Sequence, residues 1–294
     1  MMDSPTITFD ARTESKKNVI AVGVAKIMAA ALFCIAAPAH AVVVNQQVHV
    51  QTISEIAKAE AAFNLPIWSW VGYIEGNSEP DPKHHFGKRA TFLAHREVST
   101  ERTHYYIVWF HGMNGFSSEF TTRTYPALKF LIESGKSFTW IHPELPWSDN
   151  SNQIDKRVAW SIKSSFQTFM RASIVTTPPI AYNKKVEFII VGHSRGGKAI
   201  ANAAAGKDLC AFNPKAVVWS DATYSRWLDR AWASCLQNSE ALIEIWYLRN
   251  TQTQASVDRM IGNIPATRLR VNPLTAPWYH GKIGDMVMLW TKVF

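Results

Sequence analysis

The serine in Gly192-His193-Ser194-Arg195-Gly196 is the residue of this chain best placed for nucleophilic chemistry. A Gly-x-Ser-x-Gly turn between a strand and a helix holds its serine in a strained backbone conformation and lifts the hydroxyl above the sheet. The N-terminus of the helix that follows then points at whatever the hydroxyl attacks. A serine hydroxyl is a poor nucleophile at neutral pH, so it needs a base and a carboxylate that fixes the tautomer of that base.

Two residues further along the chain are candidates for these partners. Asp221 directly follows AVVWS, a predicted strand, and His280 lies in APWYHGKIGD, in a segment expected to be a loop that folds back over the sheet edge. The alternatives are that Asp221 caps the helix in TYSRWLDRAW, with Asp258 or Asp285 as the acid. A surface histidine without a catalytic role is the alternative for His280.

The segments around Ser194 have the composition that such a turn requires. VEFIIV, at 186–191, is almost continuously apolar and rich in β-branched residues, which favours a strand covered on both faces of a parallel sheet. KAIANAAAG follows Gly197, and its alanines favour a helix whose backbone can approach the sheet closely. The sequence therefore predicts a tight strand-to-helix turn at Ser194.

The rest of the chain predicts alternating strands and helices. Further strands are expected at 90–98, 105–110, 137–141, 216–220, 242–248 and near 270, with an edge strand in WSWVGYI. Further helices are expected at about 126–133, 156–172 and 224–233. This order indicates an α/β fold with a mostly parallel central sheet flanked by helices on both faces.

With these residues in place, positions from about 90 to 280 resemble the α/β-hydrolase fold superfamily of serine esterases, lipases and peptidases. The resemblance rests on Gly-His-Ser-Arg-Gly around Ser194, on FHGMNG after an earlier strand, and on the late histidine. It implies attack by Ser194, base catalysis by His280 and an acyl-enzyme that water hydrolyses. One departure is that LIEIWYL is not followed at once by a carboxylate, so the acid is assigned to Asp221, a variant position in this superfamily.

The oxyanion hole follows from the same comparison. The turn supplies one donor, the backbone N–H of Arg195. His111-Gly112 resembles the family's His-Gly loop after an early strand, which implies that the backbone N–H of Met113 is the second donor. Asn114 is adjacent and could assist through its side chain.

The N-terminal segment predicts export. Lys16 and Lys17 precede an apolar stretch that ends in Ala39-His40-Ala41, which is typical of a signal peptide at 1–41. A membrane anchor is the alternative, but the uninterrupted apolar part at 27–39 is shorter than the ~20 residues that span a bilayer. We therefore expect a single α/β-hydrolase domain at 42–294, periplasmic or secreted, with no membrane span after cleavage.

Two cysteines remain beyond the predicted cleavage site. Cys210 and Cys235 flank the predicted strand at 216–220 and the helix that follows it, so the helix end returns beside the strand start. Together with export, this placement predicts a disulfide. Two buried free thiols are the alternative.

Composition excludes several other functions. The chain has 294 residues, is 47% hydrophobic and contains 12 Trp, which is typical of a globular protein rather than a disordered one. Its net charge of +8 is scattered without a basic run, so no nucleic-acid partner is expected. The neighbouring pair His84-His85 lacks further ligands at a metal-site spacing, and no cofactor-binding motif occurs.

The working hypothesis is an exported serine hydrolase that cleaves an ester in a small-molecule or envelope-derived acyl substrate. A peptidase or amidase would use the same triad, and these residues do not separate the two. A non-catalytic, envelope-associated protein with the same fold also stays open, since fold does not dictate function.

Overall fold

The computed structural model describes residues 64–77, 89–113, 115–145, 160 and 164–294, and before them residues 54, 57 and 58. The predicted signal peptide at 1–41 and the pair His84-His85 lie outside the described residues. The described part of the chain belongs to one compact unit, Val43–Phe294. None of its helices is long and apolar enough to cross a membrane.

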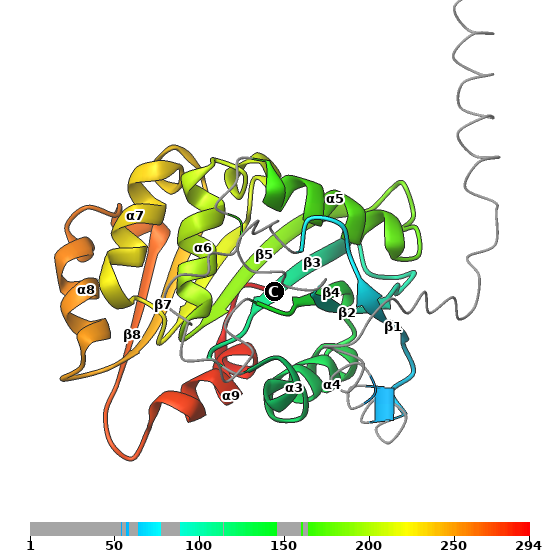
Figure 1. Ribbon diagram of the computed structural model, residues 1–294, viewed down its shortest axis with the longest axis horizontal. Helices are drawn as coiled ribbons and strands as arrows, with labels where there is room; N and C mark the ends of the chain where they lie inside the picture. The colour runs from blue at the N-terminus through cyan, green and yellow to red at the C-terminus, as the bar shows by residue number, and fades with distance from the viewer. Residues whose placement is uncertain are drawn as a thin grey trace, which may run out of the picture. The chain divides into compact units, whose positions relative to one another are not determined.

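Eight strands of the described residues form one sheet in the order β1-β2-β4-β3-β5-β6-β7-β8 (Figure 1). Their bounds are β1 Trp68–Tyr73, β2 Ala90–Arg96, β3 Thr103–Phe110, β4 Ser137–Pro143, β5 Lys185–His193, β6 Ala216–Ser220, β7 Leu242–Leu248 and β8 Leu269–Leu274. The six strands from β4 to β8 in this order pair in parallel, whereas β2 pairs antiparallel with both β4 and β1. The predicted mostly parallel sheet is confirmed, and WSWVGY forms its antiparallel edge strand.

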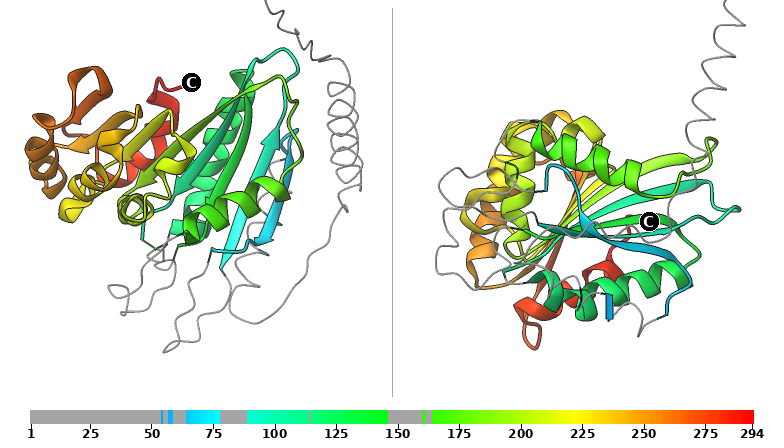
Figure 2. Two further views of the ribbon diagram at one scale, coloured as in Figure 1. Left: turned by 90° about the horizontal axis from the view of Figure 1, so that it is seen from above. Right: turned by 45° about the vertical axis from the view of Figure 1, so that its right-hand side comes forward.

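Helices cover both faces of this twisted sheet (Figure 2). Their bounds are α3 Gly115–Glu119, α4 Tyr125–Glu133, α5 Ser165–Thr176, α6 Gly196–Ala205, α7 Trp227–Ser234, α8 Gln252–Ile261 and α9 His280–Trp290. A π-helix, η1 Phe120–Thr124, joins α3 to α4. Short 3-10 helices within the described residues are η3 Cys210–Phe212, η4 Tyr224–Arg226, η5 Leu236–Asn238 and η6 Ala266–Arg268. Figure 1 shows α5, α6 and α7 on one face and α3, α4 and α9 on the other.

Alternating residues of the central strands supply the two cores. Val108 of β3 and Ile190 of β5 pack in the core that includes α5, α6, α7 and α8. Their neighbours Ile107 and Ile189 pack in the core that includes α3, α4 and α9. Because both faces of these strands are buried, the strands read as nearly continuous apolar runs.

Two expectations about helices were wrong. The helix expected at 156–172 begins at Ser165 and continues to Thr176, because Trp160 and Ser164 have left-handed φ angles of 51° and 70°. Its end is set by Pro178, since the residue before a proline disfavours helical geometry and Thr177 is extended. His280 was expected in a loop but is the first residue of α9.

The structure contains the predicted disulfide between Cys210 and Cys235, whose Cα atoms are 6.1 Å apart. Cys210 begins η3 before β6, and Cys235 directly follows α7. The bond thus joins the start of the β6–α7 unit to its end, next to the strand that precedes Asp221.

Candidate active site

Ser194 lies in the turn between β5 and α6 with a φ of 52°, a left-handed conformation that is uncommon for a residue other than glycine. Its backbone N–H donates to the carbonyl of Ser220, the last residue of β6, at 3.1 Å. The turn therefore ties the serine to the neighbouring strand. The side chain of Ser194 is partly exposed at the carboxyl edge of the sheet.

Two glycines of α6 allow this turn to form. A Cβ on Gly196 would lie 2.1 Å from the carbonyl oxygen of Phe110, and a Cβ on Gly197 would lie 1.9 Å from that of Ala222. Real Cβ atoms do not come so close to backbone atoms. The start of α6 thus fits between the ends of β3 and β6, and Gly197, which is not part of the Gly-x-Ser-x-Gly motif, is as tightly enclosed as Gly196.

Asp221 is the residue after β6 and is buried. Its carboxylate lies 2.6 Å from Nδ1 of His280 and accepts hydrogen bonds from Thr253 Oγ1 at 2.6 Å and from the backbone N–H of Leu248 at 3.4 Å. Burial alone would raise the pKa of Asp221, but the hydrogen bonds from His280 and Thr253 lower it overall. Asp221 is therefore suited to carry a negative charge beside the imidazole.

The alternative roles for these carboxylates do not match the contacts. The residue preceding α7 is Arg226, and no side chain caps that helix, so Asp221 is not its cap. Asp258 lies exposed on α8, and Asp285 forms an ion pair with Arg123 at 3.1 Å.

His280 begins α9 and is aimed at Asp221 through Nδ1, so Nε2 lies on the opposite side of the ring. The imidazole also stacks on that of His193, the residue before Ser194, with ring centroids 4.8 Å apart. This stacking brings His280 beside the turn that carries the serine. The side chain of His280 is 40% exposed, which leaves the ring accessible to a substrate.

Tyr224 is a member of this cluster that sequence reasoning missed. Its hydroxyl donates to Asp221 Oδ2 at 3.5 Å and lies 3.2 Å from Nδ1 of His280. Burial and then the charge of Asp221 raise the pKa of Tyr224, so the phenol stays protonated and remains a donor. Its position in η4, three residues after Asp221, gave no signal for this role, because η4 contains a non-helical kink at Ser225.

The loop after β3 runs beside the serine. A Cβ on Gly112 would lie 3.1 Å from the Cβ of Ser194. The Nε2 atom of His111 accepts the N–H of Leu145 at 2.8 Å, so its Nδ1 carries the hydrogen and donates to the carbonyl of Gly112 at 2.5 Å. Burial lowers the pKa of His111, which favours this neutral form.

These hydrogen bonds fix the direction of the predicted oxyanion donor. In a trans peptide the N–H points away from the preceding carbonyl. Because the Gly112 carbonyl is held by His111, the N–H of Met113 points to the opposite side of that peptide. The N–H of Gly112 itself donates to Glu119 Oε1 at 2.9 Å. The other predicted donor is the backbone N–H of Arg195, the residue directly before α6. Asn114 lies outside the described residues.

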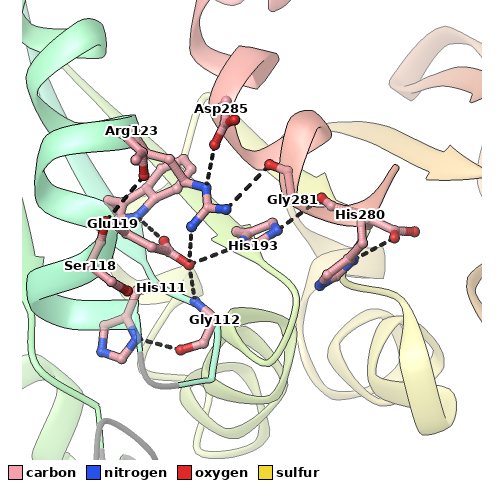
Figure 3. Close-up of polar contacts among 12 residues, drawn as sticks. His111, Gly112, Ser118, Glu119, Arg123, His193, His280, Gly281 and Asp285 are labelled. Carbon is pink, nitrogen blue, oxygen red and sulfur yellow. Dashed lines mark hydrogen bonds and ion pairs between the residues drawn. The ribbon is translucent and has the colours of Figure 1, made fainter. Parts of the chain in front are cut away.

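Glu119 is a second residue that sequence reasoning missed. It is buried, and Figure 3 shows it in contact with the loop after β3, with His193 and with Arg123. His142, the last residue but one of β4, is buried, and its Nδ1 lies 3.0 Å from Oγ1 of Thr124. In the described part of the chain, no group of three or more His, Cys, Asp or Glu side chains could hold a metal ion.

No family model and no curated protein matches the chain. Among similar solved structures, a dienelactone hydrolase from Anabaena variabilis has a TM-score of 0.50 at 11% identity, over 77% of this chain and 97% of that chain. A naproxen esterase (carboxylesterase NP) from Bacillus subtilis has a TM-score of 0.47 at 8% identity, over 84% of this chain and 99% of that chain. The sheet order and the first of these likenesses give the chain the α/β-hydrolase fold that its sequence predicts.

Proposed function

We propose that this chain, which has the α/β-hydrolase fold, is an exported serine hydrolase that cleaves esters with Ser194, His280 and Asp221. The observation that carries the proposal is the 2.6 Å contact between Asp221 and His280 beside a serine held at a φ of 52°. A strained serine next to an imidazole that is hydrogen-bonded to a buried carboxylate is the arrangement that activates a hydroxyl.

In the proposed reaction, Ser194 Oγ attacks the carbonyl carbon of the ester and its proton passes to Nε2 of His280. Asp221 stabilises the imidazolium and keeps the hydrogen on Nδ1. The tetrahedral intermediate collapses, the ester C–O bond breaks, and the alcohol leaves with the proton from His280. Water then attacks the acyl-enzyme with His280 again as the base, which releases the carboxylic acid and restores Ser194.

The negative oxygen of each tetrahedral intermediate would be bound by the backbone N–H groups of Met113 and Arg195. One such donor is worth about 3 kcal/mol of barrier, provided it is oriented before the reaction. In support of this orientation at Met113, His111 binds the carbonyl of Gly112, and Glu119 binds the N–H of Gly112.

Export is supported by the predicted leader at 1–41 and by the disulfide, since disulfides persist in oxidising compartments. A small-molecule or envelope-derived acyl compound is the proposed substrate. A triad of this kind can act on esters and on amides. Esters are proposed because the alkoxide of an ester is an easier leaving group than the amine of an amide.

Paired substrates test the proposal. Purified protein and its Ser194→Ala variant would be assayed on p-nitrophenyl esters of two to twelve carbons and on p-nitroanilides of the same acids. We expect ester hydrolysis by the wild type alone, with a loss of ~10⁴-fold to 10⁶-fold in the variant. Faster cleavage of anilides would assign an amidase or peptidase, and no hydrolysis of either series would favour the non-catalytic binding protein.

A further inference from the structure

Glu119 is a buried carboxylate that lies outside the proposed triad and receives four hydrogen-bond donors. Its Oε1 is 2.9 Å from the N–H of Gly112, 3.0 Å from Nδ1 of His193 and 2.7 Å from a terminal nitrogen of Arg123. Its Oε2 accepts the indole N–H of Trp109 at 3.1 Å. Figure 3 shows Gly112, His193 and Arg123 converging on the carboxylate.

The carboxylate is ionised in this setting. Burial alone would raise the pKa of Glu119, but the charges of His193 and Arg123 and the hydrogen bond from His193 lower it to about 2. An ionised carboxylate has acceptor sites for all four donors, which a neutral amide does not. The carboxylate is therefore satisfied by donors from several elements, and a buried polar group held in this way fixes one geometry.

Through two of its partners, Glu119 reaches the helix that carries His280. Arg123 donates to the carbonyl of Gly281 at 3.3 Å and pairs with Asp285 at 3.1 Å, the latter as an ion pair rather than an aligned hydrogen bond. Nε2 of His193 lies 3.3 Å from the carbonyl of His280. All three contacts are made to the first six residues of α9, between His280 and Asp285.

Glycines make room for this network. A Cβ on Gly284 of α9 would lie 2.5 Å from Nε of Arg123 and 2.7 Å from the ring of His193. A Cβ on Gly115 would lie 2.7 Å from Oε1 of Glu119. Glu119 is the last residue of α3, and Arg123 lies in the π-helix η1, an irregularity found frequently at functional sites.

We propose that Glu119 is a positioning residue that fixes three segments relative to one another: the loop after β3 that contains Gly112, the turn at Ser194, and the start of α9. The proposal rests on the proposed function. One carboxylate holds the N–H of Gly112, the ring next to Ser194 and, through Arg123, the backbone next to His280. Loss of its charge would let these three segments shift relative to one another, and a shift of about 1 Å at a reacting group can cost ~100-fold in rate.

Glu119→Gln tests this in the full-length protein, because the amide keeps the volume but turns an NH₂ donor toward other donors. We expect kcat on a p-nitrophenyl ester to fall roughly 10-fold to 100-fold with KM within about 3-fold of wild type. The rate of inactivation by a fluorophosphonate should fall in parallel, while the fraction of protein labelled at completion stays at the wild-type level. A merely structural role would lower the labelled fraction and leave kcat per labelled site unchanged.

Glu133→Gln is the matched control, since Glu133 is exposed on α4 and pairs with Lys129 at 3.8 Å. Its kinetics should equal those of the wild type. If Glu119→Gln does not fold, Arg123→Lys keeps a positive charge beside Glu119 but loses the fork that reaches Gly281 and Asp285. It should lower kcat roughly 10-fold with KM unchanged.

The outcomes separate the two proposals. The wild type could react with the fluorophosphonate while folded Glu119→Gln or Arg123→Lys reacts at the same rate and has the same kcat. That result would overturn the positioning role alone. A wild type that neither labels nor hydrolyses esters would overturn the proposed function, and the positioning role with it.

Discussion

At the scale of single residues, the site depends on how Asp221 is held. Three donors besides His280 bind its carboxylate: Thr253 from α8, the backbone of Leu248 at the end of β7, and Tyr224 from η4. Tyr224 lies beside the contact between Asp221 and His280 and donates to the same carboxylate oxygen. Asp221 is thus oriented from three elements before any substrate arrives.

Asp221→Asn should keep the fold but place the wrong tautomer on His280, because the amide NH₂ cannot accept the Nδ1 hydrogen. We expect kcat for ester hydrolysis to fall toward the ~10⁴-fold seen for such changes. Steady-state kinetics on a p-nitrophenyl ester would measure this. Asp258→Asn is the control, since Asp258 is exposed on α8, and it should be silent. A variant at Asp221 within a few-fold of wild type would remove Asp221 from the triad.

Part of this residue-level description could be predicted from the sequence. The positions of Ser194 and Asp221 could be predicted, because each residue directly follows a strand that the sequence shows as an apolar run. The role of Glu119 could not be predicted, because its partner His193 is 74 residues away and meets it only after the sheet has formed. Tyr224 lies three residues after Asp221 and was missed because the non-helical Ser225 leaves this segment without a regular helical pattern.

At the scale of elements, the turn at Ser194 requires that α6 begin between two neighbouring strands. The small residues of KAIANAAAG predicted this close approach, and Gly197 is where it is tightest. The start of α9 at His280 was not predicted, because Gly281 and Gly284 weaken its helical signal and serve instead to approach Tyr279 and Arg123.

Gly197→Ala should destabilise the protein, since its Cβ would lie 1.9 Å from the carbonyl oxygen of Ala222 and the backbone must move. Overpacking of this kind costs about 1–3 kcal/mol in the free energy of unfolding. Urea denaturation followed by tryptophan fluorescence would measure it. Gly262→Ala is the control, because nothing lies within 4 Å of that Cβ and its φ is −73°. Equal stabilities for the two variants would contradict the tight fit.

The disulfide between Cys210 and Cys235 spans 25 residues, which include β6 and α7. In the chain-entropy model, a loop of this size stabilises the fold by about 3 kcal/mol. The double variant Cys210→Ser and Cys235→Ser should lower the unfolding free energy by about that amount. A thiol assay on denatured, unreduced protein should find neither of these thiols free, and finding both would contradict the bond.

At the scale of the whole molecule, buried histidines make stability depend on pH. His104 of β3 bonds Ser137 and Thr139, each at 2.9 Å. Burial, then the charges of His95 and Lys184, lower the pKa of His104 to about 3. In the unfolded chain its pKa is ~6.5, so between these values the unfolded state binds a proton that the folded state does not.

The free energy of unfolding should therefore be highest above pH 6.5 and fall as the pH is lowered toward 3. For His104 alone the loss from pH 7 to pH 5 is about 2 kcal/mol. Urea denaturation at both pH values would measure it, with His104→Gln as the comparison. The variant should lose less stability than the wild type over the same interval, and an equal loss would show that His104 does not titrate as described.

Covalent labelling tests whether Ser194 is the activated nucleophile of this protein. The protein would be treated with a fluorophosphonate, digested, and its peptides analysed by mass spectrometry for the added phosphonyl mass. We expect stoichiometric modification of Ser194, and loss of labelling in Ser194→Ala but not in Glu133→Gln. An unmodified Ser194 in folded protein, or equal labelling of the Ser194→Ala variant, would contradict it.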